Sequence, residues 1–307
     1  MLNTAQLRQV AARSGARDIA NVEIDVILTH LLQLLHERGV TEHLAFKGGT
    51  MLRKMIFGPR GRLSTDLDFT ARTDISVDDL TITLLDALAE PYHGITFRFA
   101  KDKDWYLTDD GCAANPICSH ADNEKGIKIK LQISTRERPI LPVIPAQQIE
   151  QDYFRLLPFN PSAVPALAFE EVIAEKIRAA SQRSKIRDLH DLSEVIARPI
   201  NRSHVRTLAV LKLWHSTGPG LDFQRFRARI TERGNYDISD LRNLLRRDQN
   251  PDLESMIRRV TEGFQFLEQL TDAELYLTTD MPRRARKEAA NLAAAVAADS
   301  RLFPSKT

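Results

Sequence analysis

A short apolar run, a pair of glycines and a helical pattern follow one another near the start of the chain. Residues 44–46 (Leu-Ala-Phe) read as a buried strand, Gly48 and Gly49 interrupt it, and residues 50–56 have helical periodicity. A strand, a glycine turn and a helix in this order let backbone amides approach a phosphate group. The alternative is a tight turn without a ligand, in which Thr50 caps the helix.

Two aspartates follow on a segment that alternates acidic and apolar side chains. On a strand over residues 66–69, Asp66 and Asp68 share one face while Leu67 and Phe69 point to the core. Paired carboxylates suit Mg²⁺, which takes hard oxygen ligands and completes its shell with water and phosphate oxygens. Because an Asp-x-Asp pair is also found on solvated strands and turns, its meaning here comes from the glycine turn that precedes it.

The remaining pattern predicts an α+β protein with two domains. The chain has 307 residues, of which 43% are hydrophobic, and domains of about 150 residues are typical. In the first part we expect helices and strands at residues 22–36, 81–88, 95–100 and 127–134, with connectors at 138–145 and 159–165. Later helices are expected at residues 168–181, 185–196, 208–214, 223–230, 241–245, 253–270 and 284–298. A boundary near Arg198 would separate a mixed-sheet domain over residues 1–198 from a helical domain over 199–307.

Composition excludes several classes of protein. Two cysteines, Cys112 and Cys118, support neither a disulfide framework nor a zinc site, and they fit a reducing cytoplasm. No run reaches the roughly 18–20 uninterrupted apolar residues of a membrane span, so we expect no membrane partner. The net charge of +2 does not by itself indicate a nucleic-acid binder. Arginine clusters at 242–247, 258–259 and 283–286 can be solvated helix faces or an RNA-binding surface.

Four blocks in order resemble the nucleotidyltransferase superfamily, and within it the AbiEii-like toxin branch that includes the MenT toxins. The blocks are FKGGT at 46–50, LSTDLDF at 63–69, FEEVIAEKIRA at 169–179 and KIRDLHDL at 185–192. The resemblance covers roughly residues 44–197 and leaves the C-terminal helices without a matching motif. It implies a minimal nucleotidyltransferase core of the polymerase-beta-like type.

The resemblance also implies a site and a reaction. The expected metal ligands are Asp66 and Asp68, with Mg²⁺ as the ion and a nucleoside triphosphate (NTP) as the substrate. The residues expected to act in catalysis are Ser64, Asp66, Lys176 and Asp191, and those expected to bind the nucleotide are Lys47, Gly48, Gly49, Thr50, Ser64 and Lys176. The implied activity is a growth-arresting toxin that transfers a nucleotide to the 3′ end of tRNA, with a cognate antitoxin as a partner. A protein or small-molecule acceptor and a catalytically silent nucleotide-binding module are the alternatives.

Lys176 and Asp191 are linked to the acids only through the resemblance. Residues 181–184 read as a break, so we expect two helices to bring Lys176 and Asp191 together near Asp66 and Asp68. Asp188 lies three residues before Asp191 and can face the same side of its helix, where Arg187 could orient one of them.

The strand that often carries a third acid in this superfamily has none here. Its expected polar face, at residues 127–134, reads Lys128, Lys130, Gln132 and Ser134. Either the site works with the two strand acids and Asp191, or it is reduced to nucleotide binding. The two lysines can instead face the triphosphate or an RNA backbone.

Overall fold

The computed structural model describes residues 1–99, 104–108 and 111–299 and divides the chain into two compact units. Unit 1 is built from Met1–Pro139, Val143–Leu167 and Arg242–Asn250. Unit 2 is built from Ile140–Pro142, Ala168–Leu241 and the residues from Pro251 on. The division falls before the boundary expected near Arg198, because the helices that follow Ala168 pack on the later helices. Residues 300–307 of the expected C-terminal domain lie outside the described residues.

Unit 1 contains a mixed seven-stranded sheet and a small three-stranded sheet. The strand order of the larger sheet is β4-β5-β8-β2-β1-β10-β9, and that of the smaller sheet is β3-β6-β7. The strands are β1 (Leu44–Lys47), β2 (Asp66–Ala71), β3 (Thr96–Arg98), β4 (Trp105–Thr108), β5 (Gly111–Ala114), β6 (Ile117–His120), β7 (Asn123–Lys128), β8 (Lys130–Ser134), β9 (Ile144–Ala146) and β10 (Val164–Ala166). The expectation of an α+β fold with a mixed-sheet core is confirmed.

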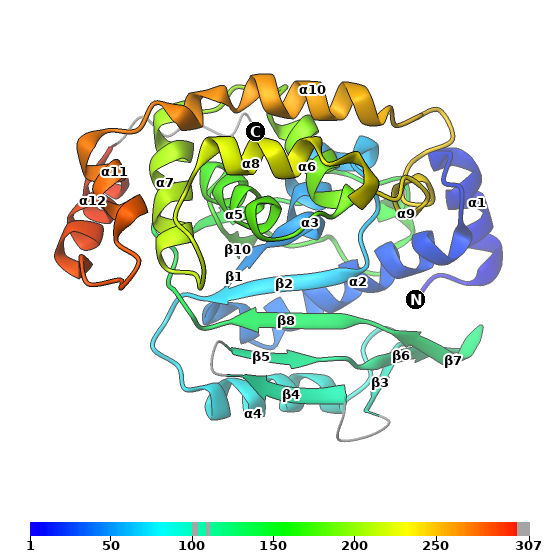
Figure 1. Ribbon diagram of the computed structural model, residues 1–307. Coiled ribbons are helices and arrows are strands. Elements are labelled where there is room, and N and C mark those ends of the chain that lie inside the picture. The colour runs from blue at the N-terminus through cyan, green and yellow to red at the C-terminus, as the bar shows by residue number, and fades with distance from the viewer. Residues whose placement is uncertain (100–103, 109–110, 300–307) are drawn as a thin grey trace. The chain divides into compact units, whose positions relative to one another are not determined.

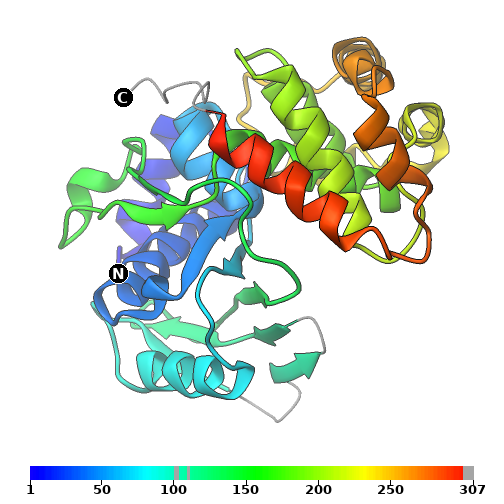
Figure 2. The ribbon, with the colours of Figure 1, turned by 90° about the vertical axis from the view of Figure 1, so that its left-hand side faces the viewer.

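Helices accompany these strands in unit 1. They are α1 (Thr4–Ser14), α2 (Ile19–Glu37), α3 (Gly48–Met51), the π-helix η2 (Leu52–Phe57) and α4 (Val77–Ala89), with short 3₁₀ turns η1 (Val40–Glu42), η3 (Gly58–Arg60) and η5 (Phe154–Leu156). Figure 1 and Figure 2 show α2 and α4 on one side of the larger sheet. The apolar sheet face includes Phe46 and Phe69, whose ring centroids lie 5.2 Å apart. A helix had been expected at 50–56; it begins at the glycines and continues as a π-helix.

Helix α2 is the central core helix of unit 1. Asp18 caps its N-terminus by accepting a hydrogen bond from the Ala20 amide, and residues 26–28 are fully buried. Helix α2 is also long and apolar enough, by length and composition, to cross a membrane, which the sequence had not led us to expect. Its apolar window is 67% buried within the protein, and its Asp25 side chain is ion-paired inside the core. These features are typical of the core helix of a soluble protein.

One expected strand is in fact two strands in different sheets. The alternation over residues 127–134 is interrupted at Ile129, whose amide donates to the Pro116 carbonyl at 3.0 Å and whose side chain is fully buried. Lys128 therefore ends β7 of the small sheet, and Lys130 begins β8 of the large sheet. The expected strand at 95–100 is β3, and Ala100 lies outside the described residues.

Unit 2 is helical. Its helices are α5 (Phe169–Gln182), α6 (Ile186–Val195), α7 (Arg202–Trp214), α8 (Phe223–Thr231), α9 (Ser239–Arg242), α10 (Leu253–Gly263), α11 (Asp272–Thr279) and α12 (Arg286–Ala298), with 3₁₀ turns η6 (Arg233–Asn235) and η7 (Gln265–Glu268). Helix α5 packs on α6, α7 and α8, while α11 and α12 pack on α7. Figure 1 shows α10 lying along α8 and α6. The expected helix at 253–270 ends at Gly263, and α11 was not expected from the sequence.

Candidate active site

The two strand aspartates lie on one face of β2, as their alternation predicts. Asp66 and Asp68 are partly exposed, whereas Leu67 and Phe69 are buried on the opposite face. The Thr65 hydroxyl donates a hydrogen bond to Asp66 Oδ1. The face that carries the carboxylates is therefore partly exposed to solvent, while the apolar side chains on the other face pack in the core.

The glycine turn is packed directly against this acidic face. Gly48 has φ +81°, a backbone conformation that L side chains rarely adopt, and a Cβ built on it would collide with the Asp68 carboxylate. A Cβ on Gly49 would collide with the Arg62 guanidinium and would lie 3.4 Å from Ser64 Oγ. The turn therefore requires glycine at position 48, where both the backbone conformation and the Asp68 side chain disfavour a Cβ, whereas a Cβ at position 49 would displace the end of the Arg62 side chain.

Backbone contacts join the turn to β2. Lys47 is the register partner of Asp68 in the antiparallel β1–β2 pair. The helix begins at Gly48 with Lys47 in the capping position, so the alternative in which Thr50 caps the helix is wrong. Thr50 lies within the first turn, where its hydroxyl donates to the Asp66 carbonyl. All the site residues expected in the first two sequence blocks thus lie together in unit 1.

Arg62 was not among the expected site residues. It is only 5% exposed although it lies in a loop, and its guanidinium donates to the Leu63 carbonyl at 3.2 Å. The loop is held in place by a distant segment, because the Leu63 amide donates to the Leu244 carbonyl at 2.7 Å. In the sequence, the only signal for Arg62 is a basic residue shortly before the acidic strand.

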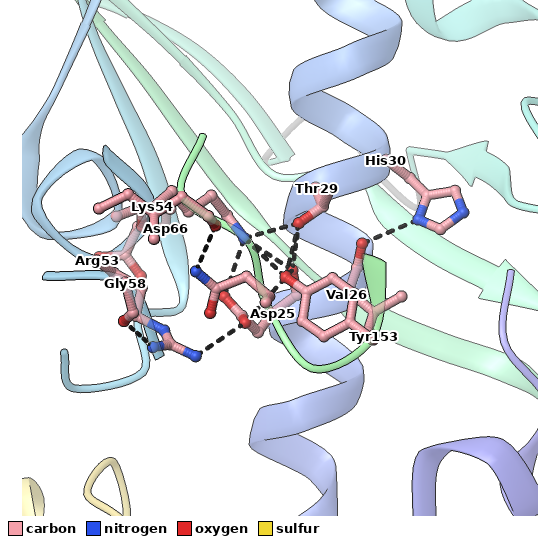
Figure 3. A network of polar contacts seen from close by, with 12 residues as sticks. Asp25, Val26, Thr29, His30, Arg53, Lys54, Gly58, Asp66 and Tyr153 are labelled. Carbon is pink, nitrogen blue, oxygen red and sulfur yellow. Dashed lines mark hydrogen bonds and ion pairs between the residues drawn. The ribbon is translucent and has the colours of Figure 1, made fainter. Parts of the chain in front are cut away.

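A buried polar network lies behind the glycine turn and was missed in the sequence. Lys54 of η2 is fully buried, and its Nζ lies 3.0 Å from Asp25 Oδ1, 2.7 Å from Thr29 Oγ1 and 3.1 Å from the Tyr153 hydroxyl. Arg53 adds a second ion pair to Asp25 at 3.5 Å. Figure 3 shows the Lys54 side chain reaching α2 at Asp25 and Thr29, with Tyr153 at the same point. This network fixes the helix that follows the turn to α2.

The charges of this network stabilise one another. Burial alone would raise the pKa of Asp25, but Lys54 and then Arg53 outweigh it, so the pKa lies below the usual aspartate value. Burial lowers the pKa of Lys54, and the Asp25 carboxylate opposes that shift. Burial and the negative charge of Asp25 raise the pKa of Tyr153 well above its usual value. The hydroxyl of Tyr153 therefore stays protonated and remains a hydrogen-bond donor.

The neighbouring strand carries a lysine and a glutamine where a third acid had been sought. Strand β8 runs parallel to β2, and Lys130 is the register partner of Asp66 while Gln132 is the partner of Asp68. Lys128 does not share this face, which corrects the single polar row expected from the sequence. It pairs instead with Asp104, which precedes β4. Residues 130 and 132 are thus the β8 positions closest to the acids.

Lys176 and Asp191 come together in unit 2. Helix α5 ends at Gln182 and α6 begins at Ile186, and across this break the Lys176 Nζ lies 2.7 Å from Asp191 Oδ2. The same ammonium lies 3.1 Å from Asp188 Oδ1, so Lys176 is buried between two acids and is not an exposed helix lysine. The expected break and the meeting of these two helices are confirmed.

Asp188 is oriented by an arginine other than the one expected. Its second oxygen accepts from Arg183 Nε at 2.8 Å, whereas Arg187 had been considered for this role. Burial would raise the pKa of Asp188, but Lys176 and Arg183 outweigh it and hold the pKa below its usual value. Both carboxylates around Lys176 are more than 97% buried.

A second buried lysine, on α7, forms ion pairs with two glutamates of α5. Lys212 of α7 is 1% exposed, and its Nζ lies 2.7 Å from Glu171 Oε1 and 3.0 Å from Glu175 Oε1. The Glu171 carboxylate also accepts hydrogen bonds from the amides of Ile140 and Leu141. This contact ties α5, and with it Lys176, to α7.

The acids of β2 could hold a magnesium ion together with ligands from other molecules. Asp66 and Asp68 supply hard oxygen ligands on one face, and the N-terminus of α3, at Gly48 and Gly49, packs against Asp68. Within residues 1–99, 104–108 and 111–299, no group of three or more His, Cys, Asp or Glu could hold a metal by itself. Water and the oxygens of a triphosphate would therefore complete the coordination.

The sheet, the glycine turn and the paired acids form a candidate nucleotidyltransferase site on an α+β fold. The sequence profile of the nucleotidyl transferase AbiEii toxin family, from type IV toxin–antitoxin systems, matches residues 30–288. The chain therefore belongs to the AbiEii family of nucleotidyltransferase toxins.

Three solved structures are similar to the chain, and the first of them shares its fold. MenT4, a nucleotidyltransferase toxin from Mycobacterium tuberculosis, is 24% identical with a TM-score of 0.76, and the match covers 96% of this chain and 99% of MenT4. A nucleotidyltransferase-like protein from Helicobacter pylori is 21% identical with a TM-score of 0.47, and the match covers 80% of this chain and 95% of that one. The H. pylori protein JHP933 is 19% identical with a TM-score of 0.46, and the match covers 86% and 97%. No curated protein matches the chain.

Proposed function

We propose that this toxin transfers a nucleotide from a magnesium-bound triphosphate to the 3′ end of tRNA. The observation that carries the proposal is the packing of the glycine turn against Asp66 and Asp68, which combines a phosphate cradle with two metal ligands. Blocked tRNA 3′ ends would stop translation and growth, which fits membership of a toxin family. The nucleotide-binding residues in this proposal are Lys47, Gly48, Gly49, Thr50, Ser64 and Lys176.

The proposed transfer is a single displacement at the α-phosphorus. The acceptor hydroxyl oxygen bonds to that phosphorus, the bond from the phosphorus to the oxygen bridging the β-phosphate breaks, and pyrophosphate leaves. The hydroxyl proton passes to solvent water. When bound, Mg²⁺ supplies positive charge that offsets the negative charge of the phosphate oxygens. Asp66 and Asp68 hold the ion, and the amides after Gly48 together with Ser64 orient the phosphates.

Lys176 and Asp191 have separate roles in this proposal. The ammonium of Lys176 contributes a compact positive charge for a phosphate, and Asp191 holds that ammonium at 2.7 Å. We propose that both groups act at the same site as Asp66 and Asp68, as the family resemblance implies. Asp188 and Arg183 keep the ion pair fixed in unit 2.

RNA as the acceptor is supported by charge in unit 2. Exposed arginines lie on α8 (Arg225 and Arg227) and on α10 (Arg258 and Arg259), and these two helices pack together. Two of the four arginines also carry surface ion pairs, with Asp222 and Glu194. Such pairs contribute little to stability and can exchange for phosphates. We further propose that the protein acts in the cytoplasm and that a cognate antitoxin restrains it, as in other type IV systems.

Transfer of labelled nucleotide would test the acceptor directly. The purified protein is incubated with each α-³²P-labelled triphosphate, Mg²⁺ and either total RNA or a protein extract. We expect label in the tRNA band, and we expect it to vanish when periodate has oxidised the terminal ribose of the RNA. Label on protein or on a small molecule would contradict the tRNA proposal, and label that survives periodate treatment would contradict the 3′ end.

A further inference from the structure

Strand β8 carries a lysine and a glutamine beside the two acids of β2, where a second metal ion would require carboxylates. Two-metal sites clamp the attacking and leaving oxygens between two cations, and further carboxylates hold the second ion. In this sheet, Lys130 is the register partner of Asp66 and Gln132 is the partner of Asp68. Register partners on neighbouring strands project to the same face, about 4.8 Å apart. A lysine therefore shares the acidic face.

Lys130 lies on the face of the sheet that carries Asp66 and Asp68. Along β8 the residues alternate between partly exposed and buried, so Lys130 and Gln132 face the site while Leu131 and Ile133 face the core. In the described part of the chain, no hydrogen bond or ion pair engages the Lys130 ammonium. Lys128, Lys54 and Lys176, by contrast, each form an ion pair with an aspartate.

An ammonium group cannot ligate a metal, but it carries positive charge. Lysine has three donors and no acceptor, so it repels a cation placed next to it. We propose that the positive charge of Lys130 takes the place of a second divalent cation, so that this site binds one metal ion for each triphosphate. The inference rests on the proposed function, because it assumes that Asp66 and Asp68 hold the ion that accompanies the triphosphate.

The charges on the neighbouring faces of β2 and β8 support a single ion. Asp66 and Asp68 contribute two negative charges, and Lys130 offsets one of them at the strand position beside Asp66. A second divalent cation would have to lie beside the ammonium, without a third carboxylate on β8 to hold it.

Manganese binding tests the inference without any need for turnover. Mn²⁺ is titrated by electron paramagnetic resonance, first alone and then with the α,β-methylene analogue of each of the four triphosphates. The wild-type protein should bind one ion in each protein–triphosphate complex. Lys130→Met should bind Mn²⁺ alone roughly tenfold more tightly, because the repulsion is removed. Lys130→Glu should gain a second ion in the triphosphate complex.

The matched control is Lys128→Met. It removes an equal charge two residues earlier in the chain, in strand β7 of the smaller sheet. Its Mn²⁺ affinity should equal that of the wild type. Two ions in the wild-type complex, or equal affinities in wild type and Lys130→Met, would overturn the inference. An equal gain in Lys128→Met would also overturn it, because the effect would then be general. If thermal melting shows that Lys130→Met is unfolded, Lys130→Gln replaces it, and we expect the same roughly tenfold gain in Mn²⁺ affinity.

Failure of this inference differs from failure of the proposed function. A wild-type protein that transfers nucleotides to tRNA but holds two ions contradicts the role of Lys130 alone. A protein that binds one ion with the lysine dependence described, but labels no RNA, contradicts the acceptor alone.

Discussion

The carboxylate of Asp191 lies 2.7 Å from the ammonium of Lys176, in a buried ion pair that also includes Asp188. Because both aspartates are almost fully buried, removal of the lysine takes this cation away from both carboxylates, and Asp188 then keeps only its ion pair with Arg183. Lys176 therefore has a structural role in unit 2 in addition to the phosphate contact that we propose for it.

Replacement of Lys176 separates these two roles. Lys176→Gln should lower the free energy of unfolding by about 3 kcal/mol, since breaking a buried pair costs about 3–5 kcal/mol, and it should abolish transfer. The double variant Lys176→Gln/Asp188→Asn should regain part of the stability, because it removes a buried carboxylate that has lost one of its two cationic partners. Urea denaturation and the transfer assay measure the two effects. Transfer that returns together with stability would show that the lysine acts only in folding.

Stability should depend on pH through Asp188. Its pKa lies below the usual aspartate value when the protein is folded, so the folded state releases this proton more readily than the unfolded state. The stabilising contribution is complete above the unfolded value of about 3.9 and is lost as pH falls below it toward the folded pKa. The unfolding free energy of Asp188→Asn should therefore fall less steeply than that of the wild type between about pH 5 and pH 2. Parallel curves would contradict this assignment.

The buried Lys54 should couple strongly to Asp25. Lys54→Met leaves a buried carboxylate with Arg53 as its remaining cation, and we expect a loss of about 3–5 kcal/mol. Asp25→Asn in the same chain should recover part of that loss. The double-mutant cycle, measured by urea denaturation, gives the coupling energy. Additive losses would mean that the two side chains stabilise the fold independently.

Gly48 should be intolerant of a side chain for two separable reasons. Gly48→Ala combines a left-handed backbone with a collision between its methyl group and Asp68, so transfer and triphosphate affinity should both fall sharply. Gly218 provides the matched control, because it also has positive φ, +108°, but no atom lies within 4 Å of a Cβ there. Gly218→Ala should cost about 1–2 kcal/mol of backbone strain and leave transfer unchanged. Equal activity in the two variants would contradict the role of the glycine cradle.

The parts of the site that were predictable from sequence depend on local periodicity. The two-residue alternation places Asp66 and Asp68 on one face of a strand, and the break at residues 181–184 separates the helices that carry Lys176 and Asp191. Neither feature needs knowledge of distant residues. The convergence of the two pairs on one pocket stays a prediction, because they belong to different compact units.

The missed features depend on contacts between distant parts of the chain. Lys54 is a charged residue in a fully buried position, which is possible because Asp25 and Tyr153 arrive from other segments. Lys128 and Lys130 alternate as in one strand, and only the contact of Ile129 with Pro116 divides them between two sheets. Strands β5 and β4, which follow β8 toward one edge of the larger sheet, are short and have no distinctive sequence pattern.

The most direct test of the account is nucleotide transfer by Asp66→Asn, which keeps the shape of the side chain and removes the charge that holds the metal. We expect the rate to fall on the order of a thousandfold, equivalent to several kcal/mol of lost stabilisation, with an unchanged melting temperature. Asp86→Asn, at an exposed position of α4, should transfer at the wild-type rate. Wild-type transfer by Asp66→Asn would contradict the assignment of this carboxylate to the metal site and, with it, the proposed mechanism.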